Sequence, residues 1–258
     1  MTNDKQSIKE KVSSVLHWYH QITMPDGSVT PGLNKSAATM AVYEKLGFPT
    51  DLRGKRVLDV GCADGYYSFI CEQRGAEEVI AVDYRQPTAS GFSVAASILE
   101  SNVKHVVDNV YDISPEKYGK FDFIIFVGVL YHLRNPLFAL DNLRKMAKPN
   151  ATVLVESHIA DDEIHETLRC EDLTEAQMNA INKISLWKFY YANTLNNDAS
   201  NKWAPNFKAL GEVCKEAQLE IVAQEKFGSR GAVLCKAISD NALEHSRKMD
   251  SATGLNVA

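Results

Sequence analysis

The segment VLDVGCADGYYSF, Val57 to Phe69, decides the fold of this chain of 258 residues. An apolar run of strand length leads into the turn GCADG at residues 61–65, and a helix-like segment follows at once. Glycine permits a tight turn at Gly61, and the small residues Ala63 and Gly65 let the backbone approach a ligand closely. A dinucleotide-binding turn would read G-x-G-x-x-G, whereas the spacing here is G-x-A-x-G. The segment therefore predicts a strand, a ligand-binding turn and a helix.

Strand-like and helix-like segments alternate along the rest of the chain. Apolar runs of strand length recur at residues 56–61, 78–83, 104–110, 121–130, 152–158, 219–227 and 231–238. The central runs are apolar on both faces, which is typical of parallel strands covered on both sides by helices. We therefore predict an α/β fold: a Rossmann-like, doubly wound, seven-stranded sheet, mostly parallel with an antiparallel edge strand and with helices on both faces.

The intervening helices carry recognisable boundaries. Helices are expected at Tyr66–Gly75, Asn135–Met146 and Pro205–Ala217. In the second of these, Asn135 is the expected N-cap and Pro136 the first helical residue. Apolar residues three positions apart predict one buried stripe: Leu137, Leu140, Leu143 and Met146. Residues 148–150 (KPN) are expected to form the turn after it.

Two segments interrupt this alternation. Residues 1–50 precede the first strand and are expected to form a helical or lid segment, and residues 51–258 form the main domain. The main domain holds an insertion at about residues 160–204, which is rich in acidic, aromatic and Asn residues. Ligands of open α/β sheets bind at the carboxyl ends of the strands, so we expect both segments to cover that edge.

Composition narrows the possible partners. Lys and Arg number 28 against 33 Asp and Glu, which gives a formal net charge of −5. Proteins that bind nucleic acid usually carry a basic surplus, so a nucleic-acid substrate is disfavoured but not excluded. The sequence has no signal-peptide pattern and no apolar run long enough to span a bilayer, so we expect a cytoplasmic protein. The five irregularly spaced cysteines, without a C-x-x-C, argue against a disulfide framework and a metal site.

Acidic residues surround the glycine turn. Asp83 closes the second strand, where a carboxylate can accept hydrogen bonds from ribose hydroxyls. Asp59 precedes the turn and Asp64 lies within it. These carboxylates would repel a phosphate and suit a ligand with a cationic head. S-adenosylmethionine carries an amine and a sulfonium and no phosphate.

The chain resembles the class I S-adenosylmethionine-dependent methyltransferases, closely over about residues 55–158 and loosely to 238. The resemblance implies that the turn holds the methionine part of the cofactor, that Asp83 binds the ribose and that Tyr84 flanks the adenine. The full set of cofactor residues implied in this way is Asp59, Gly61, Cys62, Ala63, Gly65, Asp83, Tyr84, Asn109, Val110, Val127 and Gly128. Asn109 and Val110 depart from the family pattern, which has an acid there. A nicotinamide-binding Rossmann domain is the alternative.

Two further segments resemble a narrower group. VGVLYHLRNPL (Val127–Leu137) and WYHQITMPDGSVTPG (Trp18–Gly32) are similar to tRNA wobble-uridine carboxymethyltransferases, which use carboxy-S-adenosylmethionine, and to related methyltransferases. In those enzymes a tyrosine, an arginine and a lysine hold the extra carboxylate. Tyr131 matches the tyrosine, and Arg230 matches the arginine with a one-residue offset. The lysine has no match, because the region reads HWYH at residues 17–20, and the basic N-terminal extension is absent.

The reactive end of the site is expected near the fourth strand. His132 is a candidate general base, since an ordinary histidine pKa suits that task, or else a structural residue that fixes the turn. Tyr131 would orient donor or acceptor. The candidates on the acceptor side are Trp18, Tyr19, His20, Glu156, His158, Trp203, Asn206 and Arg230. An aromatic group in the insertion, Trp187, Phe189, Tyr190 and Tyr191, is either an acceptor wall or core.

The sequence predicts direct methyl transfer from S-adenosylmethionine to an O or N nucleophile of a small-molecule acceptor, with no metal and no membrane partner. Such a displacement needs positioning and exclusion of water rather than a covalent intermediate. Two alternatives stay open: carboxymethyl transfer from carboxy-S-adenosylmethionine to a tRNA wobble uridine or nucleotide-like acceptor, and a non-catalytic cofactor-binding module.

Overall fold

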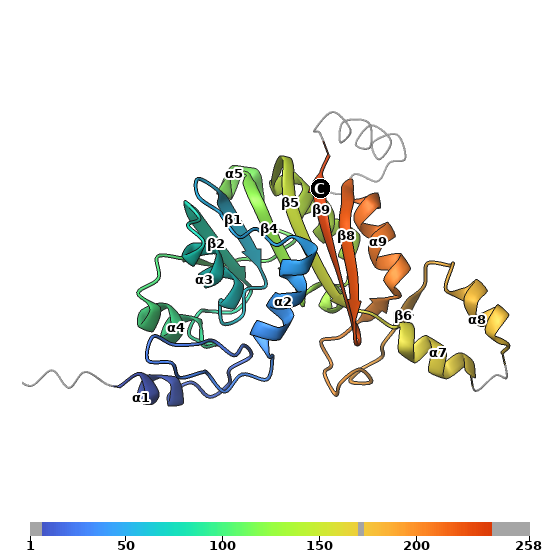
Figure 1. Cartoon of the computed structure of the whole chain (residues 1–258), viewed down its shortest axis with the longest axis horizontal. Coiled ribbons are helices and arrows are strands. Elements are labelled where there is room, and N and C mark those ends of the chain that lie inside the picture. The colour runs from blue at the N-terminus through green and yellow to red at the C-terminus, as the bar shows by residue number, and fades with distance from the viewer. Residues whose placement is uncertain (1–6, 170–172, 239–258) are drawn as a thin grey trace, which may run out of the picture.

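A seven-stranded sheet forms the centre of the molecule. The computed structural model describes residues 7–169 and 173–238 (Figure 1). The sheet has the order β3-β2-β1-β4-β5-β9-β8. Its strands are β1 (Arg56–Val60), β2 (Glu78–Asp83), β3 (Lys104–Val107), β4 (Phe121–Val127), β5 (Ala147–His158), β8 (Leu219–Phe227) and β9 (Arg230–Ala237). The predicted doubly wound α/β sheet is confirmed.

The direction of the strands brings the site residues to one edge. β1 pairs in parallel with β2 and β4, and β4 with β5, so these strands end at the same edge of the sheet. β9 pairs antiparallel with both β5 and β8. The strand that runs against the others therefore lies one position inside the edge. Its first residue, Arg230, pairs with His158 at the carboxyl end of β5.

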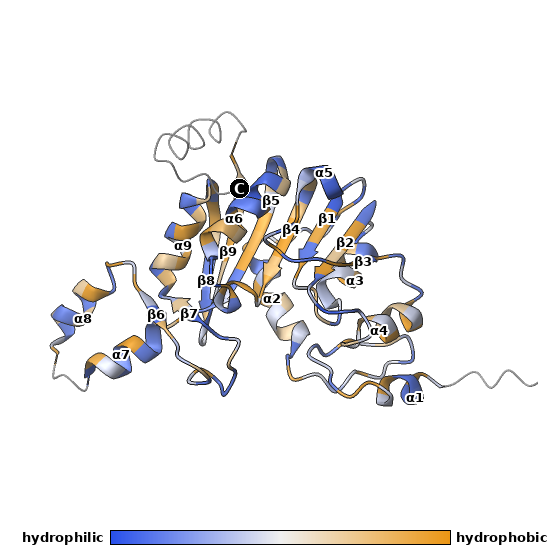
Figure 2. Cartoon of the chain, turned by 180° about the vertical axis from the view of Figure 1, so that it is seen from behind, coloured by the Kyte–Doolittle hydropathy of each residue, from blue (hydrophilic) through white to orange (hydrophobic). Residues whose placement is uncertain are grey.

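Helices cover both faces of the sheet, and each face has its own apolar core. One core includes residues of α2 (Ser36–Leu46), α3 (Tyr66–Gln73) and α4 (Phe92–Leu99). The other includes residues of α6 (Pro136–Met146) and α9 (Phe207–Glu216), beside α5 (Pro115–Tyr118). The strands between them are largely apolar (Figure 2). Burial on both faces explains why the central strands read as continuous apolar runs.

Two details of the α6–β5 unit differ from the prediction. Leu137 is 46% exposed, whereas Leu140, Leu143 and Met146 are fully buried. Three residues turn a helix by about 300°, which is about 60° short of a full turn. Leu137 precedes Met146 by three such spacings, so the two residues lie on opposite sides of the helix. The expected turn at 148–150 lies inside β5, with Asn150 at φ 62°. The pairing of β5 with β4 has an irregularity between Phe121 and Phe123, so the turn-forming residues produce a bulge.

The insertion and the N-terminal segment have little regular structure. The N-terminal segment contains α1 (Ile8–Ser13) and α2. The insertion contains α7 (Asp161–Arg169), α8 (Glu175–Ile181) and the antiparallel pair β6 (Trp187–Phe189) and β7 (Trp203–Pro205). α7 and α8 extend away from the sheet and bury no residue (Figure 1). Helices long and apolar enough to cross a bilayer are absent from the described residues.

Four of the five cysteines lie in the described residues. Cys62, Cys71, Cys214 and Cys235 are free and buried. The fifth, Cys170, lies outside the described residues. Burial raises the pKa of the Cys62 and Cys71 thiols well above the ordinary range, so both are protonated and act as small apolar groups.

Candidate functional site

The glycine turn joins β1 to α3 as the sequence predicts. Gly61 and Gly65 have φ angles of 80° and 86°, and Ala63 also lies in the left-handed region at 49°. A Cβ on Gly61 would lie 2.2 Å from Cγ2 of Val129. The Gly61 N–H donates to the Val82 carbonyl oxygen at 2.7 Å, which ties the turn to β2. Only glycine fits position 61, because both the backbone angle and the close neighbour exclude a side chain.

Asp83 stands beside this turn as an ionised carboxylate. One of its oxygens accepts the Ala63 N–H at 3.1 Å. The Arg85 backbone N–H and guanidinium donate to the two oxygens at 2.9–3.2 Å. Burial alone would raise the pKa of Asp83, but the bonds from Arg85 outweigh burial and lower it. Arg85 was not predicted from the sequence. A cation two residues after the acid that closes a strand could have indicated an ion pair between the two.

Asp59 lies under the turn near the end of β1. It is buried, and it accepts a hydrogen bond from the Ser68 hydroxyl at 2.6 Å. Burial raises the pKa of Asp59 to about 7, and the charge of Asp83 adds to the shift, while the Ser68 bond opposes it. Near neutral pH, Asp59 therefore exists in both charge states.

Asp64 has a different task from the one predicted. Its Oδ2 accepts the backbone N–H groups of Tyr19 at 2.6 Å and His20 at 2.8 Å, and its Oδ1 accepts that of Gly91 at 2.8 Å. With both oxygens in use, Asp64 connects the N-terminal segment and the loop before α4 to the glycine turn. The prediction from the sequence is instead that this carboxylate suits a cationic ligand.

The residues expected near the adenine differ in exposure. Tyr84 is 76% exposed, and the Arg85 guanidinium lies 5.5 Å from its ring centroid. The Asn109 side-chain oxygen accepts the Tyr111 N–H at 3.0 Å, so it serves the local turn after β3. Val110 is buried. The departure from the family pattern at 109–110 thus produces a structured turn rather than a free carboxylate.

The other end of the site is a polar cluster at the ends of β4, β5 and β9. The Glu156 carboxylate, 1% exposed, accepts the Gly128 N–H at 2.9 Å and the Arg230 guanidinium at 2.8 Å, with a second, shorter bond from Arg230 Nε. The Arg230 guanidinium also lies 4.9 Å from the Tyr131 ring centroid. Burial would lower the pKa of Arg230, but the Glu156 charge raises it, so Arg230 stays charged. Four predicted residues, from distant parts of the sequence, meet here.

Two histidines flank this cluster. The His132 ring lies 4.1 Å from that of Tyr131, in the short helix η1 (Leu130–His132), and burial lowers its pKa. His158 lies 3.1 Å from Glu163 Oε1, and Glu163 also accepts bonds from Lys188 at 2.7 Å and the Tyr190 hydroxyl at 2.9 Å. Glu163 was missed by the sequence reasoning, because nothing local marks a helix carboxylate as a partner of β5.

The predicted N-terminal residues divide by role. The buried Trp18 indole packs on Gly91, where an added Cβ would lie 2.2 Å from the ring, and its Nε1 donates to the Val12 carbonyl at 3.0 Å. Tyr19 is 44% exposed. His20 is buried beside Tyr66 and Tyr67, and burial lowers its pKa to about 4, so it is neutral at pH 7.

The predicted residues of β7 and α9 hold the insertion. Trp203 Nε1 donates to the Leu133 carbonyl at 2.6 Å, and its ring stacks on Phe189 at 5.4 Å. The Asn206 side-chain oxygen caps α9 by accepting the Ala209 N–H at 2.9 Å, and its amide donates to the Ile184 carbonyl. Asn206 thus caps α9 and holds the insertion, and its place on the acceptor side stays a prediction.

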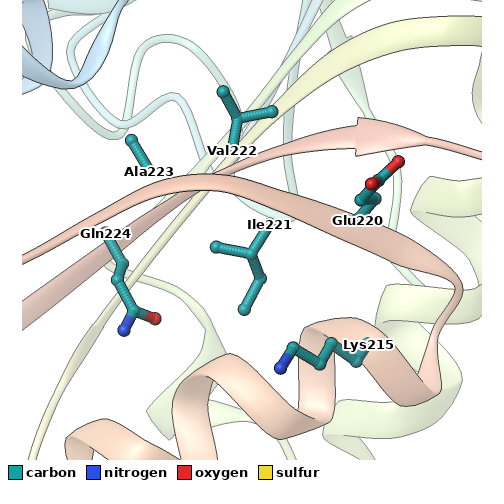
Figure 3. A pocket seen from close by; sticks show the side chains of 6 residues that line it. All are labelled: Lys215, Glu220, Ile221, Val222, Ala223 and Gln224. Carbon is teal, nitrogen blue, oxygen red and sulfur yellow. The ribbon is translucent and has the colours of Figure 1, made fainter.

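A separate open groove lies on the edge of the sheet (Figure 3). It is formed by α9 and β8 and lined by Lys215, Glu220, Ile221, Val222, Ala223 and Gln224. It contains none of the residues predicted for cofactor or acceptor. Clusters of side chains suited to a metal ion are absent from residues 7–169 and 173–238.

Comparison with known proteins identifies a family and several relatives of this chain. A family model described as a methyltransferase domain matches residues 37–224. The tRNA U34 carboxymethyltransferase of Pseudomonas aeruginosa (strain LESB58) is 35% identical over 131 residues, which cover 50% of this chain and 40% of the relative. The protein of that name from Azotobacter vinelandii is 36% identical over 123 residues, or 47% and 38% of the two chains. The match thus spans about two fifths of these curated relatives.

Solved structures agree with this fold. The N-terminal domain of EvdMO1, crystallised in the presence of SAH and D-fucose, is 13% identical, with a TM-score of 0.59 over 92% of this chain and 97% of that one. The 1,6-didemethyltoxoflavin-N1-methyltransferase of Burkholderia thailandensis is 15% identical, with a TM-score of 0.54 over 79% and 77%. The chain belongs to the methyltransferase domain family, as a class I S-adenosylmethionine-dependent methyltransferase.

Proposed function

We propose that this chain transfers a methyl group from S-adenosylmethionine to an O or N nucleophile of a small-molecule acceptor. One observation carries the proposal: Gly61 of the cofactor turn packs against Val129, the residue between Gly128 and η1. The turn is thereby in direct contact with the segment that bears Tyr131 and His132. A donor bound at the turn would have its reactive end beside these two side chains.

The residues present suit S-adenosylmethionine. Gly61, Gly65 and Gly128 have positive φ angles, which glycine adopts without strain. Asp83 is ionised and suits the ribose hydroxyls, once Arg85 shares or releases its oxygens. When bound, the cofactor supplies a methyl group activated by the sulfonium.

The chain's own residues would position the acceptor and take up its proton. Burial lowers the pKa of His132, so its imidazole is neutral at pH 7 and able to accept a proton from a hydroxyl or an amine. Tyr131 is buried, and burial raises its pKa, so its hydroxyl is protonated and acts as a donor of hydrogen bonds. The N-terminal segment, tied to the turn through Asp64, would exclude water from the transfer.

Carboxymethyl transfer is the second candidate. The relatives reported above are named for this reaction on a tRNA uridine. Tyr131 and Arg230, which match two of their three carboxylate ligands by resemblance, lie together in this chain. However, the region of the third ligand has His20, which is buried and neutral. Together with the net charge of −5, this favours the methyl donor and a small acceptor.

The test is a pair of calorimetric titrations of the full chain, one with S-adenosylmethionine and one with carboxy-S-adenosylmethionine. We expect tighter binding of S-adenosylmethionine, and mass spectrometry of the purified protein should find it or S-adenosylhomocysteine. Tighter binding of the carboxylated donor, with transfer to tRNA, would replace our proposal by the second candidate. Cofactor binding without turnover on any trial acceptor would support the non-catalytic module.

A further inference from the structure

Residues of the insertion contact three successive residues at the end of η1, namely Tyr131, His132 and Leu133. The Lys202 backbone N–H donates to the Tyr131 carbonyl at 2.9 Å, and Trp203 Nε1 donates to the Leu133 carbonyl at 2.6 Å. Between them, Ser200 Oγ lies 2.9 Å from His132 Nδ1. Because the backbone is bound on both sides of His132, the contact between Ser200 and the imidazole belongs to an ordered junction rather than to a free loop.

The proton on the Ser200 hydroxyl is already committed. Ser200 Oγ lies 2.6 Å from Asp198 Oδ1, and the Ser200 backbone N–H donates to the same oxygen at 2.8 Å. An ionised carboxylate only accepts, so the single hydroxyl proton points to Asp198. The Ser200 oxygen then offers a lone pair to His132, which must donate from Nδ1.

We propose that Asp198 and Ser200 are positioning residues that hold His132 in the tautomer protonated at Nδ1, with Nε2 free to take the acceptor's proton. The base role of His132 rests on the proposed function, whereas the tautomer follows from the contacts themselves. The tautomer of a histidine is set by the hydrogen bond that its other nitrogen makes. In this chain that bond comes from the insertion, so the acceptor-side segment also prepares the base.

The charges around His132 are mixed. Burial lowers the pKa of His132, and the cations Arg230 and Lys202 lower it further, while Asp198 and a hydrogen bond to the backbone of Ser200 raise it. Lys202 is itself tied to this loop, because its ammonium donates to the Ala199 carbonyl at 2.9 Å. Asp198 thus opposes both cations, and its removal should leave His132 harder to protonate.

The experiment is nitrogen NMR of His132 in the full chain without acceptor, with the His132→Ala spectrum to assign the signals. We expect a protonated Nδ1 and an unprotonated Nε2 in the parent. Ser200→Ala should remove this preference, and Ser200→Thr, which keeps the hydroxyl, should retain it. Asp198→Asn should lower the pH at which the ring titrates. Asp198 and Ser200 are exposed, so these changes leave the core intact.

Ser28→Ala is the matched control. Ser28 donates to Asp26 Oδ1 at 2.6 Å in a turn of the same form, so its loss should leave the His132 signals unchanged. A parent protonated at Nε2, or signals that Ser200→Ala does not change, would overturn the proposal. Since one hydrogen bond contributes about 1 kcal/mol, Ser200→Ala should lower kcat/KM on the order of 5-fold. Full activity of His132→Ala would instead overturn the base role, whatever the tautomer.

Discussion

Single carboxylates near the turn differ in their tasks because their surroundings differ. Asp83 ends β2, Asp59 lies near the end of β1, and Asp64 lies in the turn that follows β1. Asp83 is paired with Arg85, Asp59 is buried against Ser68, and Asp64 binds backbone N–H groups. The residue type is the same, but the available partners decide between ligand binding, titration and tethering.

Asp83→Asn tests the ribose contact. The variant keeps the size of the side chain but loses its charge, so S-adenosylmethionine should bind about 10-fold or more weakly, as is usual for hydrogen bonds to a charged group. Calorimetry measures this affinity. Asp51→Asn, at an exposed ion pair with Arg53, is the control and should bind normally. Equal affinity of Asp83→Asn and the parent would contradict the assignment.

Asp59 predicts a distinct pH dependence of stability. Its folded pKa of about 7 lies above its ordinary value of 3.8, so the folded state binds the proton more tightly than the unfolded state. Its contribution to stability is therefore fully present below about pH 4 and is lost as the pH rises to about 7. Urea unfolding of Asp59→Asn should show a smaller loss of stability with rising pH over this window than the parent. Parallel curves for the two proteins would refute the shift.

At the scale of elements, the turn between β1 and α3 requires glycine at positions 61 and 65, because the residues packed around it leave no room for a side chain there. Gly61 faces Val129, just before η1, and Gly65 faces Phe92 of α4, where an added Cβ would lie 2.7 Å from the ring. The residue before η1 and the first residue of α4 thus determine which residues the turn accepts. The same closeness brings the segment that bears Tyr131 and His132 to the glycine turn.

Gly61→Ala separates backbone strain from steric conflict. It should weaken cofactor binding and lower the unfolding midpoint, because the φ angle of 80° and the contact with Val129 both oppose a Cβ. Adding Val129→Ala should recover part of the loss, since only the steric conflict is relieved. Gly54→Ala is the control: Gly54 has a φ of 68° but open space around its Cβ position, so only the strain remains. Thermal unfolding and calorimetry follow both effects, and equal losses in Gly54→Ala and Gly61→Ala would show that contact with Val129 is unimportant.

At the scale of the whole molecule, the site is closed by segments from both sides of the sheet core. Asp64 binds the N-terminal segment, and Glu163 of α7 binds both β5 and β6. Figure 1 shows α1 and α7 at opposite ends of the molecule, with the sheet between them. The flanking segments therefore contact the main domain separately, one at the glycine turn and one at the end of β5.

Asp64→Ala should release the N-terminal segment. Three backbone N–H groups would lose their acceptor, so amide hydrogen exchange at Tyr19, His20 and Gly91 should become faster while the strands keep their protection. Cofactor affinity should fall as water enters the site. Asp26→Ala, in the same segment but away from the turn, should leave these amides protected. Unchanged exchange at residues 19 and 20 in Asp64→Ala would show that other contacts hold the segment.

The sequence by itself determined the fold class and the glycine turn after the first strand, and it predicts the cofactor residues at that turn and the transfer residues after the fourth strand. Each of these depends on a local sequence pattern: a buried strand, glycines at a fixed spacing and an acid at the end of the next strand. The helix stripe was predicted less well, because a spacing of three drifts around the helix and left Leu137 exposed.

Only the tertiary structure decided how these residues are used. Glu156 meets Arg230 across 74 positions, Asp64 meets His20 across 44, and His132 meets Ser200 across 68. No local pattern records such pairs, because they depend on which strands are neighbours and on which loops return to the same edge. The physical reason is that a side chain's charge, tautomer and hydrogen bonds are set by the atoms around it in space, whereas the chain order specifies only its neighbours along the backbone.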